Sequence, residues 1–73
     1  MLFVFEQLPP SAKFVFKILE YKGPLTQKEI IEETVLPPRT VRYALTRLKS
    51  LKYIKERFNF KDARQPIYFV DAH

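Results

Sequence analysis

The stretch from residue 25 to residue 51 constrains the fold of this chain most strongly, because it holds two helix patterns joined by a very short turn. Thr26 and Glu29 have the spacing of a capping box, in which the Thr hydroxyl and the Glu carboxylate each satisfy an exposed backbone N–H group. This predicts a short helix over residues 27–34. A double proline then ends the turn, and the second proline suits the first position of another helix, where its missing N–H would be unpaired anyway.

The second helix, expected from Pro38 to Ser50 or Leu51, has two unlike faces. At about 100° per residue, its apolar side chains fall on one side. They are Val41, Ala44, Leu45, Leu48 and Leu51. The opposite side carries a second set with spacing i, i+3, i+4, i+7, namely Arg39, Arg42, Tyr43 and Thr46. Two helices joined in this way predict a helix-turn-helix, whose second helix is narrow enough to enter the DNA major groove. One face should pack and the other should bind a partner.

A further helix is expected before this unit. Ser11 is a suitable N-cap for a helix over residues 12–21. Its apolar residues include Phe14, Ile18 and Tyr21 on one face, with Val15 and Leu19 beside them. Gly23 then ends the helix, because glycine tolerates the left-handed conformation common there.

Two β-rich runs follow the helix-turn-helix. Residues 53–58 alternate as a strand does, and residues 67–70 form the second run. The polar, basic segment between them predicts a hairpin whose tip carries Lys61 and Arg64. Phe58 and Phe60 alternate with polar residues, so we expect them to pack. Because RNA stacking needs aromatic side chains spread over a sheet surface, a two-stranded hairpin argues against an RNA-binding role.

The predicted fold class is α+β, mainly α: a three-helix winged helix-turn-helix with a C-terminal β-hairpin wing. With 73 residues the chain has room for one domain and one modest core. We expect the domain over residues 11–73, preceded by an apolar arm over residues 1–10. The arm contains the run Leu2–Phe5, which either makes a dimer contact or folds back over the core of its own chain.

Charge is segregated along the chain. Residues 36–64 carry nine Lys or Arg against Glu56 and Asp62, a net charge of +7, whereas residues 1–35 carry −1. Segregated basic charge is the electrostatic signature of a polyanion binder. The alternative is a solvated surface that happens to be basic.

Composition argues against several other classes. No apolar run approaches the roughly 18 residues that span a bilayer, so we expect a cytoplasmic protein that does not bind membranes. Cysteine is absent and the one histidine is His73, which leaves no thiolate metal site and no cofactor to expect. Ser11 and Ser50 have no partner histidine, so nothing supports catalysis. No small-molecule site is evident.

At this point the chain resembles the small archaeal and bacterial winged-helix transcription regulators, most nearly the MarR-like group. The residues that carry the resemblance are 23–30 (Gly-Pro-Leu-Thr-Gln-Lys-Glu-Ile), 36–45 (Leu-Pro-Pro-Arg-Thr-Val-Arg-Tyr-Ala-Leu) and Leu48. The segment from Asp62 to Arg64 is similar to the Asp-x-Arg wing motif of that group. The resemblance implies that Arg64 enters the minor groove and that Asp62 steadies the wing.

The chain departs from the family pattern in two ways. Such proteins often have glycine where this chain has Val35 and Lys52, and a β-branched residue is costly at positive φ. We therefore expect the turn around Val35 to take another shape or to be strained. Full-length MarR-like regulators also have long flanking helices that form the dimer, which this sequence does not show. We expect its dimer to be built differently and no ligand-sensing domain to be present.

These considerations predict a set of DNA-binding residues: Arg39, Thr40, Arg42, Tyr43, Thr46, Arg47, Lys61 and Arg64. Guanidinium groups suit both guanine edges and phosphates. The threonines suit phosphate or a thymine methyl group, and the wing cations suit the backbone or minor groove. The alternatives are a solvated helix face and a mobile loop tip.

The leading hypothesis is a sequence-specific binder of double-stranded DNA, a transcription regulator that acts as a homodimer on two half-sites. The Leu2–Phe5 arm is one candidate for the dimer contact. Two alternatives stay open. One is a winged-helix protein-interaction module of a transcription or repair assembly, and the other is a chromatin protein indifferent to sequence.

Overall fold

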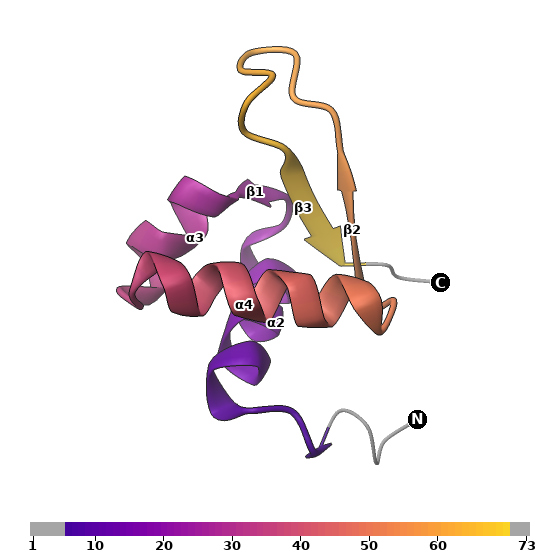
Figure 1. Ribbon diagram of the computed structural model, residues 1–73. Helices are drawn as coiled ribbons and strands as arrows, with labels where there is room; N and C mark the ends of the chain where they lie inside the picture. The colour runs from indigo at the N-terminus through magenta and orange to yellow at the C-terminus, as the bar shows by residue number, and fades with distance from the viewer. Residues whose placement is uncertain (1–5, 71–73) are drawn as a thin grey trace.

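A computed structural model of the protein describes residues 6–70, so the Leu2–Phe5 arm lies outside the described residues. Within this described part of the chain, three helices and three short strands follow one another (Figure 1). In order they are α2 (Pro10–Lys22), β1 (Leu25–Thr26), α3 (Gln27–Thr34), α4 (Pro38–Ser50), β2 (Ile54–Arg57) and β3 (Ile67–Val70). The predicted winged helix-turn-helix with a C-terminal hairpin is therefore confirmed. Across residues 6–70, no helix combines the length and apolar character that crossing a membrane requires.

Helix α2 differs from its prediction at both its start and its inward face. It begins at Pro10 with Pro9 as N-cap and no side-chain cap, so the assignment of Ser11 as the cap was wrong. Proline is preorganised for the first helical position, which moves the start upstream. Phe14 and Tyr21 are 42% and 93% exposed. The buried face holds Ala12, Val15 and Leu19 instead.

Helices α3 and α4 match their predicted bounds. The capping box is present: Glu29 N–H donates to the Thr26 hydroxyl at 3.2 Å, and the Glu29 carboxylate accepts from Thr26 N–H at 2.8 Å. The core between the helices and the sheet is made of buried apolar side chains from most elements. They are Leu8, Ala12, Val15, Leu19, Ile30, Val41, Ala44, Leu45, Leu48 and Ile54. Leu8, from the segment expected to precede the domain, thus packs in this core.

The wing is part of a three-stranded antiparallel sheet in the order β1-β3-β2. β1 pairs with β3, placing Leu25 opposite Tyr68 and Thr26 opposite Ile67. The predicted short extended link before α3 is therefore a strand that ties the wing to the helix-turn-helix. The loop between β2 and β3 projects beyond the helices (Figure 1).

Two aromatic residues of the wing, Phe58 and Phe60, are exposed to solvent instead of packed in the interior. Phe58 is 58% exposed and Phe60 is 92% exposed, so the prediction that they pack in the interior was wrong. Their rings contact each other edge to face, with centroids 4.9 Å apart. Both residues follow the last residue of β2, Arg57, so strand alternation no longer determines which way they point.

The two positions that lack the family's glycine both have positive φ. Val35, the C-cap of α3, has φ 59° and ψ 23°, and Lys52 has φ 67°. The Val35 N–H still donates to the Ile31 carbonyl at 2.8 Å, which closes the helix end. The turn keeps the left-handed shape, and Val35 is strained in it, by roughly 1–2 kcal/mol for a residue with a Cβ atom.

Replacing Val35 with glycine is accordingly expected to stabilise the domain. Val35 is 84% exposed, so the substitution removes little buried surface while relieving the strain. The greater chain entropy of glycine offsets part of the gain. We expect a net increase of about 0.5–1 kcal/mol in the free energy of unfolding, seen as a rise of about 3–6 °C in Tm by circular dichroism. A fall in Tm would show that the valine side chain is stabilising.

Candidate nucleic-acid interface

Helix α4 turns its polar face outward because its apolar residues all enter the core. Val41, Ala44 and Leu48 are fully buried, and Leu45 is 3% exposed. With these residues fixed, the helical period leaves the other side in solvent. Of the predicted contacts on this helix, Arg39, Arg42, Thr46 and Arg47 are exposed, Tyr43 is 54% exposed, and Thr40 is half-buried. We call this set the α4 polar face.

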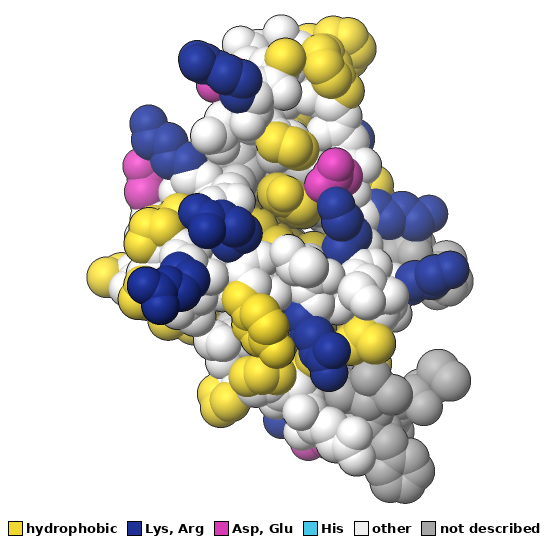
Figure 2. All heavy atoms as spheres, in the orientation of Figure 1, with side chains coloured by type: hydrophobic (Ala, Val, Ile, Leu, Met, Phe, Trp, Pro, Cys, Tyr) yellow, Lys and Arg dark blue, Asp and Glu magenta, His cyan; other side chains and the backbone are white. Residues whose placement is uncertain are grey.

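The arginines of the α4 polar face are available for a partner. Within residues 6–70, the ion pairs of the structure join other groups, and Arg39, Arg42 and Arg47 take part in none of them. Figure 2 shows Lys and Arg side chains spread over the face that α4 and the wing present, with few acidic side chains among them. The three guanidinium groups therefore carry their charge into solvent.

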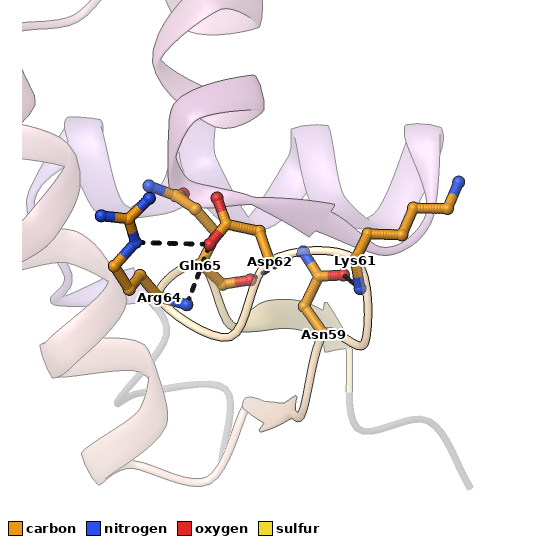
Figure 3. Close-up of polar contacts among 5 residues, drawn as sticks. All are labelled: Asn59, Lys61, Asp62, Arg64 and Gln65. Atoms are coloured by element: carbon orange, nitrogen blue, oxygen red, sulfur yellow. Dashed lines mark hydrogen bonds and ion pairs between the residues drawn. The ribbon is translucent and has the colours of Figure 1, made fainter.

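The tip of the wing is held by side chains that bond to its own backbone (Figure 3). The Asn59 amide donates to the Gln65 carbonyl at 2.9 Å and its oxygen accepts from Lys61 N–H at 3.0 Å. The Asp62 carboxylate accepts from Arg64 N–H at 3.0 Å. Such side-chain turns fix a loop without a hydrophobic core. Asp62 thus braces the loop, as the resemblance implied.

The Arg64 side chain leaves this braced loop and enters solvent. It is 92% exposed, and its Nε lies 3.7 Å from the Asp62 carboxylate. An exposed ion pair at that distance is weak, about 0–1 kcal/mol, so the guanidinium can exchange it for a phosphate or a groove contact at little cost. Lys61 is also exposed, while its backbone is held by Asn59. Asn59 was not among the predicted site residues, because its only signal was that of an Asx residue before a turn.

One basic residue near the α4 polar face is already engaged. The Lys49 ammonium donates to the Glu56 carboxylate at 2.9 Å, joining α4 to β2. This hydrogen bond raises the pKa of Lys49 above its ordinary value. Burial raises the pKa of the neighbouring Tyr68 phenol, and the Glu56 charge adds to that effect. Lys49 therefore stabilises the joint between helix and wing.

The helix before α4 has the opposite charge. Glu29, Glu32 and Glu33 are exposed on α3, and Glu33 pairs with Lys22 at 3.5 Å. This acidic surface would repel phosphate, so a polyanion is directed toward α4 and the wing. In residues 6–70, no group of three or more His, Cys, Asp or Glu side chains could hold a metal ion.

Comparison with solved structures finds this winged-helix architecture in proteins that include named transcriptional regulators. No protein-family model and no curated protein matches the chain. A probable transcriptional regulator from Pseudomonas aeruginosa has 20% identity and a TM-score of 0.82, over 89% of this chain and 49% of its own. YusO from Bacillus subtilis has 28% identity and a TM-score of 0.79, over 86% of this chain and 45% of its own.

A third solved structure is a mutant MarR from E. coli in complex with operator DNA, with 15% identity and a TM-score of 0.82, over 90% of this chain and 47% of that one. The resemblance to the MarR-like group is thus confirmed for the fold. The chain spans less than half the length of each of these proteins.

Proposed function

We propose that this protein binds double-stranded DNA as a transcription regulator, with α4 in the major groove and the wing on the backbone or in the minor groove. The observation that carries the proposal is the division of α4. Its leucine side is buried, and its arginine side faces solvent without an ion pair among residues 6–70. A helix so divided presents donors suited to guanine edges and phosphates.

The proposed contacts lie on two elements, α4 and the wing. On α4 they are Arg39, Thr40, Arg42, Tyr43, Thr46 and Arg47. On the wing, Lys61 and Arg64 extend from a loop that Asn59 and Asp62 brace. The solved complex of MarR with operator DNA supports this assignment by its fold. Because guanidinium, phenol and hydroxyl groups are mixed on one helix face, we propose readout of sequence in addition to charge.

We further propose that the protein acts in the cytoplasm as a homodimer. A single winged helix buries little surface on DNA, and two copies on half-sites about one helical turn apart would give useful affinity. The unit that binds is the domain over residues 11–73, with the Leu2–Phe5 arm as a candidate contact between the copies.

Titration of duplex DNA at several salt concentrations tests this function. If each copy neutralises about five phosphates, the logarithm of the binding constant should fall with the logarithm of salt with a slope of about −4 to −5 per copy. A pool of random duplexes should yield an enriched sequence. Equal affinity for every duplex would indicate a chromatin protein. An absence of binding near physiological salt would contradict the proposal and favour a protein-interaction module.

A further inference from the structure

The sheet has a second face that, apart from Lys61, the proposed duplex contacts do not use. Glu56, which binds Lys49 of α4, lies opposite Tyr68, and Tyr68 lies opposite Leu25. Residues paired across antiparallel strands share a face, and their neighbours along each strand point the other way. Arg57, Ile67 and Thr26, which are also paired, therefore point away from α4.

We propose that this outer side binds unpaired nucleotides of a single-stranded nucleic acid, by stacking of bases on Phe58 and Phe60. We call it the outer sheet face and define it by Arg57, Phe58, Phe60, Lys61, Ile67 and Phe69. The proposal goes beyond the duplex contacts of α4 and the wing, because it assigns a different ligand to a surface that shares only Lys61 with them.

The aromatic pair is arranged as a platform. Phe58 and Phe60 are 58% and 92% exposed, and their rings meet edge to face with an interplanar angle of 75°. This geometry makes each ring brace the other while it leaves most of the Phe60 ring in water. The Asn59 bonds to Lys61 and Gln65 hold the backbone on both sides of Phe60. An exposed ring on a braced loop loses little conformational entropy when a base stacks on it.

A hollow beside the platform has the size of a ligand site. Its volume is about 540 Å³, within the range of about 300–1,000 Å³ typical of small-ligand sites. Pro24, Phe58, Phe60 and Ile67 supply apolar lining. A planar base fits such a wall, because every base has an apolar ring face.

Charge on the same face favours phosphate. Arg57 and Lys61 line the hollow, and the Arg57 guanidinium lies 5.8 Å from the centroid of the Phe69 ring. Arginine stacked on an aromatic ring extends a platform for bases. Glu29 also lines the hollow, but its carboxylate is held by the Thr26 N–H at 2.8 Å as part of the capping box. The two cations therefore outnumber the one acid, which is itself engaged.

This combination fits a single strand better than other polyanions. In a duplex the base faces are stacked on one another and cannot reach an aromatic platform, whereas unpaired bases can. An acidic peptide would satisfy Arg57 and Lys61 but would offer nothing to the exposed ring of Phe60. From the sequence, two strands and buried phenylalanines were predicted, which spoke against stacking. The sheet instead has three strands, and both rings are exposed.

A tryptophan variant of the full chain tests the proposal. The protein contains no Trp, so Phe60→Trp introduces a single fluorophore at the platform. Single-stranded oligothymidylate should quench its fluorescence, and an abasic oligomer of equal length should not. Anisotropy titration with labelled oligothymidylate should show Phe60→Ala binding about ten-fold or more weakly than the wild type, the effect expected for loss of one stacked base. Tyr21→Ala, at a residue 93% exposed on α2, is the matched control and should bind as the wild type does.

Each of the following results would overturn the inference: equal affinity for the abasic oligomer, no effect of Phe60→Ala, or displacement of oligothymidylate by polyglutamate at equal charge concentration. The last would identify an acidic peptide surface. Arg42→Ala separates this site from the proposed duplex function, because it should weaken duplex binding and leave oligothymidylate binding unchanged. Loss of both activities in Arg42→Ala would place the single strand on α4 and would likewise contradict the inference.

Discussion

Replacing Arg39 and Arg42 together with alanine should weaken binding to duplex DNA by about 100-fold or more and leave Tm within about 2 °C of the wild type. Each bidentate contact of arginine with a base is worth about 1–3 kcal/mol, and the two losses should combine on one helix face. Neither side chain makes an ion pair within residues 6–70, so the folded state loses little. Anisotropy titration and thermal unfolding measure the two quantities.

The double variant also separates base contacts from phosphate contacts. If the arginines bind phosphates, affinity should fall uniformly across sequences and the salt slope should decrease by about two. If they bind bases, discrimination between sequences should fall instead. Lys17→Ala with Lys22→Ala is the matched control, because it removes two cations from α2, where each pairs with a glutamate. A large loss of Tm in the arginine variant would mean that Arg39 or Arg42 is structural.

Leu48→Ala should produce the largest loss of stability of any single truncation on α4. The Leu48 side chain is fully buried among residues of the core that anchor this helix. Truncation of a buried leucine costs about 2–5 kcal/mol, the sum of lost burial and the cavity left behind. A domain this small has only about 5 kcal/mol or a little more to lose, so the variant should keep only about 0–3 kcal/mol of stability at 25 °C.

Urea denaturation of the Leu48→Ala variant measures this loss. Leu51→Ala is the comparison, because Leu51 is half-buried at the end of the same helix and its truncation should cost distinctly less. A loss below about 1 kcal/mol for Leu48→Ala would show that α4 is not anchored by its leucine side. The buried leucines would then not explain why the α4 polar face points into solvent.

The sequence predicted α3 and α4 closely because their signals are local. A capping box and a proline at the first position mark the starts, and a single apolar stripe sets the phase of α4. Helix α2 also begins at a proline, but it lacked a single apolar stripe, since Phe14 and Tyr21 on one side compete with Val15 and Leu19 on another. Helical periodicity alone does not decide which of the two apolar faces is buried. Packing of α2 against α4 buries the face with Val15 and Leu19.

Features that depend on distant pairing were not predictable in the same way. β1 has only two residues, and it exists as a strand because β3, some 40 positions later, pairs with it. Phe58 and Phe60 are apolar and follow a strand, and nothing local indicated that both would stay in solvent. In the candidate site, the outward direction of Arg39 and Arg42 followed from the α4 stripe. The bracing of the wing by Asp62 followed from the resemblance.

The most direct test of the central claim is an NMR titration of the isotope-labelled protein with duplex DNA. If the arginine side of α4 and the braced wing form the duplex interface, amide shift changes should concentrate in residues 38–47 and 59–65. Amides of α2 should move little. Changes centred on α2 with α4 unaffected would contradict the account, because the outward guanidinium groups of α4 would then not be where DNA binds.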